Sequence, residues 1–153
     1  MHLAQLNIAR ARWPLEDPQM AEFVDNLERI NELAEQSPGY VWRLQDDSGD
    51  ATSIKLFDDP GIIVNMSVWE SVEASKNFIF NTHHVDFLKR RYDWFEKMQQ
   101  ASHVMWWIEP GHLPTPAEAV DRLEHLRDHG DTANAFGFRA TDFHTSPSNP
   151  VPA

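Results

Sequence analysis

The chain has 153 residues, and its 24 acidic and 13 basic side chains give it a formal net charge of −11. Such a surface repels phosphate backbones and anionic lipids, so we expect neither a nucleic acid partner nor a membrane partner. The absence of cysteine excludes disulfides, thiolate metal sites and a cysteine nucleophile. No signal-peptide pattern opens the sequence, and no apolar run approaches the length of a membrane span. The sequence therefore predicts a soluble cytoplasmic protein.

The first predicted elements are a strand and a helix. Residues 2–10 alternate between apolar and polar side chains, which is typical of a strand with one buried face. Asp17 and Pro18 then supply an N-cap and a proline at the first helical position. From Met20 onward apolar residues recur at helical spacing, and 37–39 (Ser-Pro-Gly) ends this helix.

The next part of the chain predicts three strands. They are expected over 40–45, 52–57 and 62–69, separated by turns over 46–50 and 58–61 that are rich in Asp and Gly. The first two are expected to lie beside one another.

The strand predicted over 62–69 has two different faces. One face is apolar, and the other carries Asn65, Ser67 and Trp69. This pattern indicates a sheet that packs helices on one side and builds a site or an interface on the other. Ser71 supplies an N-cap for the helix that follows directly.

The C-terminal half predicts two more helices and a strand. A segment after the 81–82 interruption has an apolar stripe at helical spacing, which is expected to be buried. The stripe consists of Val85, Leu88, Tyr92, Phe95 and Met98. Residues 103–109 form a strand that is apolar on both faces. The capping box 115–118 opens a helix that closes near Gly130, and 136–139 is a candidate short strand.

This order of elements predicts an α+β fold. We expect a ferredoxin-like sandwich, in which an antiparallel sheet has helices on one face and a further helix is appended. Residues 1–140 would form this single domain. Ser, Asn and Pro dominate residues 141–153, where we expect a disordered tail.

Four tryptophans on the predicted strands suggest an interface. One helix layer cannot hide all of Trp42, Trp69, Trp106 and Trp107, and a large exposed apolar face usually marks a contact surface. A two-fold homodimer whose two sheets close on each other would bury them and leave a pocket inside each protomer.

Several segments of the chain resemble a known group of proteins. They are 3–9, 39–45, 65–74 with Phe78, His84 with Leu88, 94–95, 106–107, 111–112 and 118–119. The segment around Trp69 resembles the dimeric α+β barrel superfamily of antibiotic-biosynthesis monooxygenases. The closer resemblance is to an uncharacterised bacterial family known as domain of unknown function 3291. The resemblance implies a dimeric α+β barrel and brings no established activity.

Some members of that superfamily degrade haem with an Asn on the first strand, a Trp on the helix after the Trp-x-Ser motif, and a later His. Asn7 matches the first of these. Phe78 stands at the Trp position, and the His position falls near Leu88, one turn after His84. One match in three does not carry haem degradation over to this chain.

Two polar residues on predicted strands are candidates for binding a ligand. Asn7 could hydrogen-bond a ligand carbonyl or a dioxygen species, or it could be a polar residue at the dimer seam. Arg43 could present a fork to a substrate carboxylate, or it could form an ion pair across the dimer.

The histidines divide in the same way. His83 and His84 point about 100° apart on a helix, so they cannot chelate as a pair. We favour His84 as a general base or axial ligand, with a helix cap or surface role as the alternative. His103 and Trp107 share a strand face and could complete a pocket, or His103 could simply end its strand.

Other clusters carry less chemistry. Asp121, His125 and His129 recur every four residues, a spacing that can grip a metal, but nothing nearby completes such a site. We interpret them as a solvated helix face and predict no metal site. No phosphate-binding glycine loop or nucleophile elbow is present, so nucleotide cofactors and serine hydrolysis have no support.

These observations lead to one functional hypothesis and one alternative. The hypothesis is a monooxygenase-like enzyme without a nucleotide cofactor, acting on an apolar or aromatic small molecule. Its pocket would lie between the sheet and the helix that carries His84. The catalytic residues would be His84 and Asn7, and the substrate-binding residues Arg43, Asn65, Trp69, His103 and Trp107. The alternative is a binding module for haem or a hydrophobic metabolite, so the cofactor is either none or haem.

Overall fold

The computed structural model describes residues 1–45, 57–82 and 84–147. Within them, four strands form one sheet in the order β2-β3-β1-β4, and all neighbouring strands are antiparallel. These strands are β1 (His2–Arg10), β2 (Tyr40–Arg43), β3 (Ile62–Trp69) and β4 (His103–Ile108). Helices join β1 to β2 and β3 to β4, so this is the predicted α+β fold of ferredoxin-like type.

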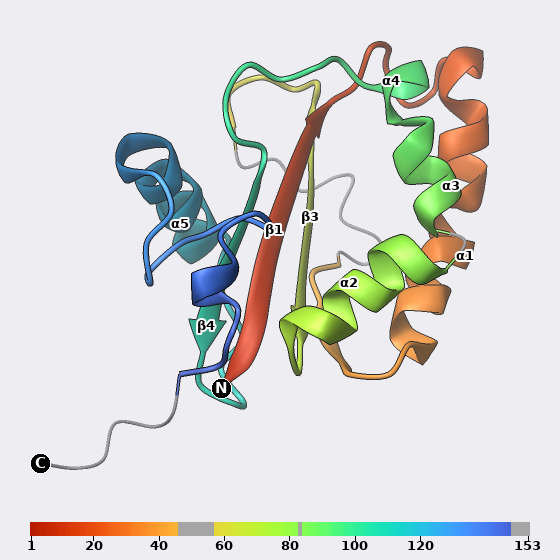
Figure 1. Ribbon diagram of the computed structural model, residues 1–153. Coiled ribbons are helices and arrows are strands. Elements are labelled where there is room, and N and C mark those ends of the chain that lie inside the picture. The colour runs from red at the N-terminus through yellow and green to blue at the C-terminus, as the bar shows by residue number, and fades with distance from the viewer. Residues whose placement is uncertain (46–56, 83, 148–153) are drawn as a thin grey trace, which may run out of the picture.

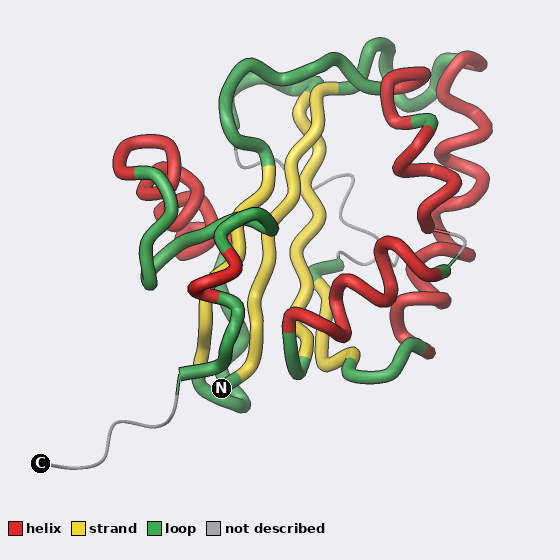
Figure 2. The backbone as a smooth tube through the Cα atoms, in the orientation of Figure 1, coloured by secondary structure: helices red, strands yellow, loops and turns green. Residues whose placement is uncertain are grey.

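Helices lie on both sides of the sheet, as Figure 1 shows. One side carries α1 (Ala21–Gln36), α2 (Val72–Asn81), α3 (His84–Lys89) and α4 (Arg91–Trp94), and the other carries α5 (Pro116–His129). Figure 2 shows the strands as the middle layer between these two groups. The appended helix α5 therefore covers a sheet face that the sequence argument had left open.

The sheet face toward α5 forms the main apolar core. Alternate residues of the three longer strands meet α5 residues there, and all are buried. The strand residues are Ala4, Leu6, Ile8, Ile62, Val64, Met66, Val68, Val104, Trp106 and Ile108, and the helix supplies Ala119, Leu123 and Leu126. Burial stabilises the fold by roughly 1.5–3 kcal/mol for each large side chain. The apolar face of β3 thus packs on α5, and its polar face turns toward α1 to α4.

The chain after α5 crosses the edge of the sheet at β4. Met105 and Phe136 form an isolated bridge with two backbone hydrogen bonds of 2.8 and 3.0 Å. Phe136 then joins Leu3, Val72 and Met105 in a second apolar cluster, on the α2 side of the sheet. The strand predicted over 136–139 is therefore reduced to this bridge, which still pairs the free edge of β4.

The first residues of the segment predicted to be a disordered tail belong to the folded domain. Thr141–Phe143 forms a short 3-10 helix, and the Phe143 ring lies 6.0 Å from that of Phe136. The carbonyl of Phe143 accepts a hydrogen bond from Trp107 Nε1 at 2.9 Å. The disordered tail expected over 141–153 is thus wrong for these residues, because Phe143 anchors them to the second apolar cluster. Residues 148–153 lie outside the described residues.

The long helical segment predicted after residue 82 breaks into α3 and α4. Phe95 leaves the helix and bridges Ala11 beyond the end of β1, and Arg12 N–H donates to the carbonyl of Trp94 at 2.8 Å. As a result Trp94 is buried, and Tyr92, which the stripe placed inside, is 46% exposed.

The strand predicted over 52–57 lies, apart from Phe57, outside the described residues.

Three helix starts follow the predicted capping chemistry. Ser71 Oγ accepts a hydrogen bond from Ala74 N–H at 3.1 Å, and Thr115 Oγ1 accepts one from Glu118 N–H at 3.1 Å. Asp17 accepts one from Gln19 N–H at 2.8 Å, although it caps the 3-10 helix Pro18–Met20 that leads into α1. Each side chain satisfies an N–H group that has no partner within its helix.

The tryptophans do not form one exposed face. Trp106 is buried on the α5 side, Trp69 is buried on the α2 side, and Trp42 and Trp107 are partly buried against the two apolar clusters. The aromatic interface from which we predicted a homodimer is therefore covered within one chain. A homodimer stays a prediction that needs its own support.

Candidate functional site

Asn65, Asn7 and His103 form one row across the sheet. Asn7 lies directly opposite Asn65 of β3 on one side and His103 of β4 on the other, so the three side chains share one face of the sheet. Neighbouring side chains in this row are about 5 Å apart. This face looks toward α2, because Trp69, on the same face of β3, stacks on Phe78 with ring centroids 5.3 Å apart. Asn7 and Asn65 are exposed although β1 and β3 are the inner strands. The helical layer therefore leaves this part of the sheet accessible.

A hydrogen-bond network lies beside this row. Gln5 Nε2 donates to Asn65 Oδ1 at 2.9 Å and to Ser67 Oγ at 2.7 Å. Ser67 Oγ also accepts a hydrogen bond from Trp69 Nε1 at 2.9 Å. Gln5 is only 6% exposed, and Ser67 and Trp69 are buried too. The network thus runs from a buried indole to an exposed amide.

Aromatic rings continue from Trp69 toward α3. The Trp69 ring contacts Tyr40 edge-on at 5.7 Å as well as stacking on Phe78. Phe78 in turn lies 4.9 Å from the ring of His84, at the start of α3. These contacts link the polar network on the sheet to the histidine that the sequence analysis favoured.

His84 is held as a neutral imidazole. Burial lowers its pKa below the usual value of 6.5, and the carbonyl of Ile79, 3.4 Å from Nδ1, partly opposes that shift. The ring therefore carries little charge near pH 7 and can accept a proton. This is the electrostatic state that a general base requires.

His103 is a second neutral imidazole at the same face. Its ring stacks on Phe138 at 4.6 Å with an interplanar angle of 11°. Burial lowers its pKa from 6.5 to about 4. Its Nε2 is buried and has no hydrogen-bond partner among the residues that the structure describes. Buried polar atoms in native proteins are nearly always bonded, so this nitrogen points to a ligand or a bound water.

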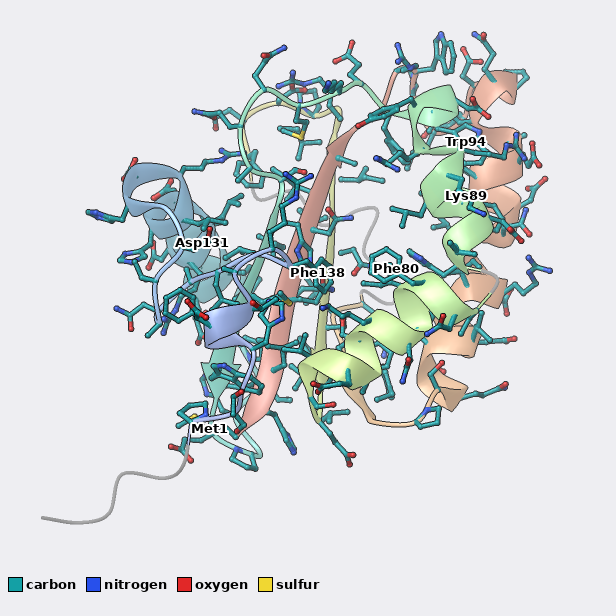
Figure 3. All side chains as sticks on the ribbon, viewed as in Figure 1. Met1, Phe80, Lys89, Trp94, Asp131 and Phe138 are labelled. Carbon is teal, nitrogen blue, oxygen red and sulfur yellow. The ribbon has the colours of Figure 1, made fainter. Side chains whose placement is uncertain are left out.

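Phe138 also brings α2 into the site. Its ring lies 5.9 Å from Phe80, and Lys76 Nζ lies 5.9 Å from the same ring. Figure 3 shows Phe80 and Phe138 near one another in the space between β1 and α2. Phe80 is 46% exposed, so an apolar edge of the site faces solvent.

Arg43 and Trp107 have partners within the chain. Arg43 lies opposite Ser67 on the site face, and its Nε donates to Glu35 of α1 at 2.8 Å. The ion pair expected for Arg43 thus exists, within one protomer. The Trp107 indole N–H donates to Phe143, and its ring contacts Phe136 at 6.4 Å. Trp107 therefore packs in the second apolar cluster, two rows from His103.

Gln5, Ser67 and Phe138 belong to this site but were not among the site residues predicted from the sequence, although Ser67 had been placed on the site face. Gln5 and Ser67 are 62 residues apart and meet only because the β1–β3 register places them opposite each other. The alternation of both strands was the available signal, since it put their polar residues on one face. Phe138 came from a segment that was predicted to be a strand.

The outer side of α5 carries an open hollow of about 680 Å³. It is lined by Glu118, Asp121, Arg122, His125 and other residues. Because α5 lies on the other side of the sheet from α2, the hollow is on the opposite side from the row described above. No group of three or more His, Cys, Asp or Glu side chains suited to a metal exists among the described residues. Asp121 and His129 are exposed, whereas His125 is partly buried, and its Nε2 lies 3.1 Å from Thr132 Oγ1.

The His84 ring lies 4.9 Å from that of Phe78 in a tilted contact, and its Nδ1 faces the carbonyl of Ile79 at 3.4 Å. A contact of this kind orients an imidazole and leaves Nε2 as the nitrogen that can accept a proton or a ligand. No step of the chemistry below passes through haem.

Comparison with protein families gives a clear assignment. Residues 2–150 match the model described as "Domain of unknown function (DUF3291)". The chain belongs to this family. The match covers all four strands and α1 to α5. No curated protein matches the sequence.

Solved structures similar to this family member include three bacterial proteins. A point mutant of SnoaB, a cofactor-independent oxygenase from Streptomyces nogalater, shares 15% identity at a TM-score of 0.48, covering 74% of this chain and 98% of SnoaB. A putative antibiotic biosynthesis monooxygenase from Chloroflexus aurantiacus J-10-fl shares 22% at 0.44, covering 73% and 97%. NE2512, a protein of unknown function from Nitrosomonas europaea, shares 13% at 0.48, covering 74% and 95%. Likenesses this distant say nothing about activity.

Proposed function

We propose that this protein is a small-molecule enzyme of the monooxygenase type, without a nucleotide cofactor, that acts on an apolar or aromatic substrate. The observation that carries the proposal is the row Asn65–Asn7–His103. In this row the exposed amide of Asn7 lies between the exposed amide of Asn65 and His103, whose buried Nε2 has no partner among the described residues. Amides on a rigid sheet can hold a substrate oxygen, and a neutral imidazole can take its proton.

The surroundings suit a flat apolar substrate. Phe80 and Phe138 form an apolar edge beside His103, whose ring stacks on Phe138. Trp69 is buried two rows along β3 from Asn65 and stacks on Phe78. Aromatic rings favour stacked or edge-on contact with a planar ligand. Arg43 lies one row away, and its guanidinium is paired with Glu35 of α1.

The reaction balances with dioxygen as the only co-reactant. For a phenolic substrate, the neutral imidazole of His103 accepts the O–H proton while the amides of Asn7 and Asn65 hold the resulting oxygen. One atom of O₂ then enters a ring carbon. The other leaves as water with the two hydrogen atoms that the substrate loses from its O–H and C–H bonds. The product is a quinone, and no external reductant is consumed.

The proposal is tested by incubating the purified protein with 1-naphthol and other hydroxylated aromatics under ¹⁸O₂. Mass spectrometry should detect a quinone that carries one ¹⁸O atom. Asn7→Ala and Asn65→Ala should each lower the rate at least tenfold, because each removes a polar anchor of the reacting oxygen. Asn134→Ala is the matched control, since this exposed asparagine follows α5 and lies outside the row.

Two outcomes contradict the proposal. Oxidation at equal rates in wild type and both row variants would place the chemistry elsewhere. Tight binding of the aromatics without any ¹⁸O product would instead make the protein a binding module for hydrophobic metabolites.

The proposal includes a homodimer. The homodimer is supported by the sequence resemblance alone. The sheet face that was expected to form the interface is covered by α5 and gives it no further support. Analytical ultracentrifugation should give twice the chain mass of 17.7 kDa. A monomer at micromolar concentration would remove the dimer from the proposal and leave the site within one chain unchanged.

A further inference from the structure

The network beside the site row has a direction that starts at Trp69. An indole N–H can only donate, so Ser67 Oγ must accept from Trp69 Nε1. The same oxygen accepts a second hydrogen bond from Gln5 Nε2. The other proton of that Gln5 amide goes to Asn65 Oδ1. Both N–H groups of Gln5 are therefore used within the network.

This arrangement fixes which end of the Asn65 amide faces outward. Its oxygen is held by Gln5, so its Nδ2 group, with two N–H donors, is the end left for the exposed side. Gln5 cannot easily release it. The glutamine is 6% exposed, and the ring of its distal partner Trp69 is locked between Tyr40 and Phe78.

We propose that Gln5 is a positioning residue that holds Asn65 as a hydrogen-bond donor, and that the site thereby selects ligands with an acceptor oxygen. The inference rests on the proposed function in placing the ligand beside Asn65. Gln5 thereby determines that Asn65 offers the ligand a hydrogen-bond donor and not an acceptor. A ligand carbonyl or oxyanion gains a hydrogen bond at this position, and an isosteric hydrocarbon does not.

The test compares two isosteric probes by calorimetric titration, 2-acetylnaphthalene and 2-isopropenylnaphthalene. They differ only in a carbonyl oxygen against a methylene group. Wild type should bind the ketone about five- to tenfold more tightly, the usual net value of one hydrogen bond.

Two isosteric substitutions should remove this preference. Asn65→Asp keeps the acceptor for Gln5 and replaces the outward donor by a carboxylate oxygen. Gln5→Glu removes the donor, so the Asn65 amide turns its N–H groups toward the new carboxylate and its oxygen toward the ligand. Gln100→Glu, an exposed glutamine that receives the same charge change, should retain the preference. If the buried substitution Gln5→Glu impairs folding, Asn65→Asp still tests the proposal, because Asn65 is exposed.

Hydrogen exchange of the side-chain amides, followed by NMR without any ligand, tests the same polarity separately. The Gln5 Nε2 protons should exchange at least 100-fold more slowly than the Asn65 Nδ2 protons, because the former are buried and bonded. Protected Asn65 protons, or an unchanged ketone preference in Gln5→Glu, would overturn the inference. Should neither probe bind wild type, the site for aromatic ligands fails, while the exchange result still decides the role of Gln5.

Discussion

The two faces of the sheet are built for different tasks. Toward α5, alternate residues of β1, β3 and β4 are apolar and sealed. Toward α2, β1 and β3 present Gln5, Asn7, Asn65 and Ser67, of which the two asparagines are exposed, and the second apolar cluster lies on the same side. A rigid strand supports both, because a period of two separates its packing residues from its polar ones. The exposed asparagines can therefore be changed without loss of the core on the α5 face, and the predictions below test that separation.

The largest effect is expected on the α5 face. Leu6 is fully buried there, so Leu6→Ala should lower the free energy of unfolding by about 2–5 kcal/mol through lost burial and a residual cavity. Leu113→Ala removes the same atoms from a side chain that is 54% exposed and should cost less than about 0.5 kcal/mol. Urea denaturation measures both. Equal costs would mean that the α5 face is not the main core.

A pH-dependent effect is expected at His103. Its pKa is lowered to about 4 in the folded protein, so between pH 6.5 and 4 the unfolded chain binds a proton that the folded chain does not. Above pH 6.5 His103 is neutral in both states and does not affect the free energy of unfolding. As the pH drops toward 4, proton binding to the unfolded chain lowers that free energy by on the order of 3 kcal/mol. His103→Asn should lack this part of the acid destabilisation in denaturation curves at several pH values. The exposed His129→Asn is the control, and parallel curves for wild type and His103→Asn would refute the burial of the ring.

A smaller effect is expected where α5 meets the sheet. Glu118 accepts a hydrogen bond from Trp106 Nε1 at 2.8 Å and contacts His112 Nε2 at 2.7 Å, in place of the return bond of a capping box. Glu118→Ala leaves the buried indole N–H without its partner and should cost about 1–3 kcal/mol. Glu124→Ala, on an exposed position of the same helix, should cost far less in thermal unfolding. Similar costs would show that the hydrogen bond from Trp106 to Glu118 contributes little to stability.

The smallest effect on stability is expected on the α2 face. Asn7 is exposed, so Asn7→Ala should change the free energy of unfolding by no more than about 0.5 kcal/mol. Turnover of the aromatic substrate should nevertheless fall at least tenfold, as proposed above. Chemical denaturation and the ¹⁸O assay on one preparation give both values. A large loss of stability would make Asn7 a packing residue.

The elements of the fold could be predicted because alternation and helix capping are local signals. The site could be predicted only in part. Asn7 and Asn65 were found because each lies on the polar face of a strand, but the importance of Gln5 depends on the register between strands 62 residues apart. Phe143 sits in a segment of Ser, Asn and Pro, so its composition concealed an anchor. The role of α5 was hidden because a helix pattern does not say which sheet face it covers.

The most direct test of the separation between the two faces is an NMR titration of ¹⁵N-labelled protein with 1-naphthol, following the side-chain amide signals. We predict that the signals of Asn7, Asn65 and Gln5 shift together with one dissociation constant, while that of Asn134, near α5, stays fixed. Shifts at Asn134 with none at Asn7 and Asn65 would contradict the account and move the ligand to the hollow on α5.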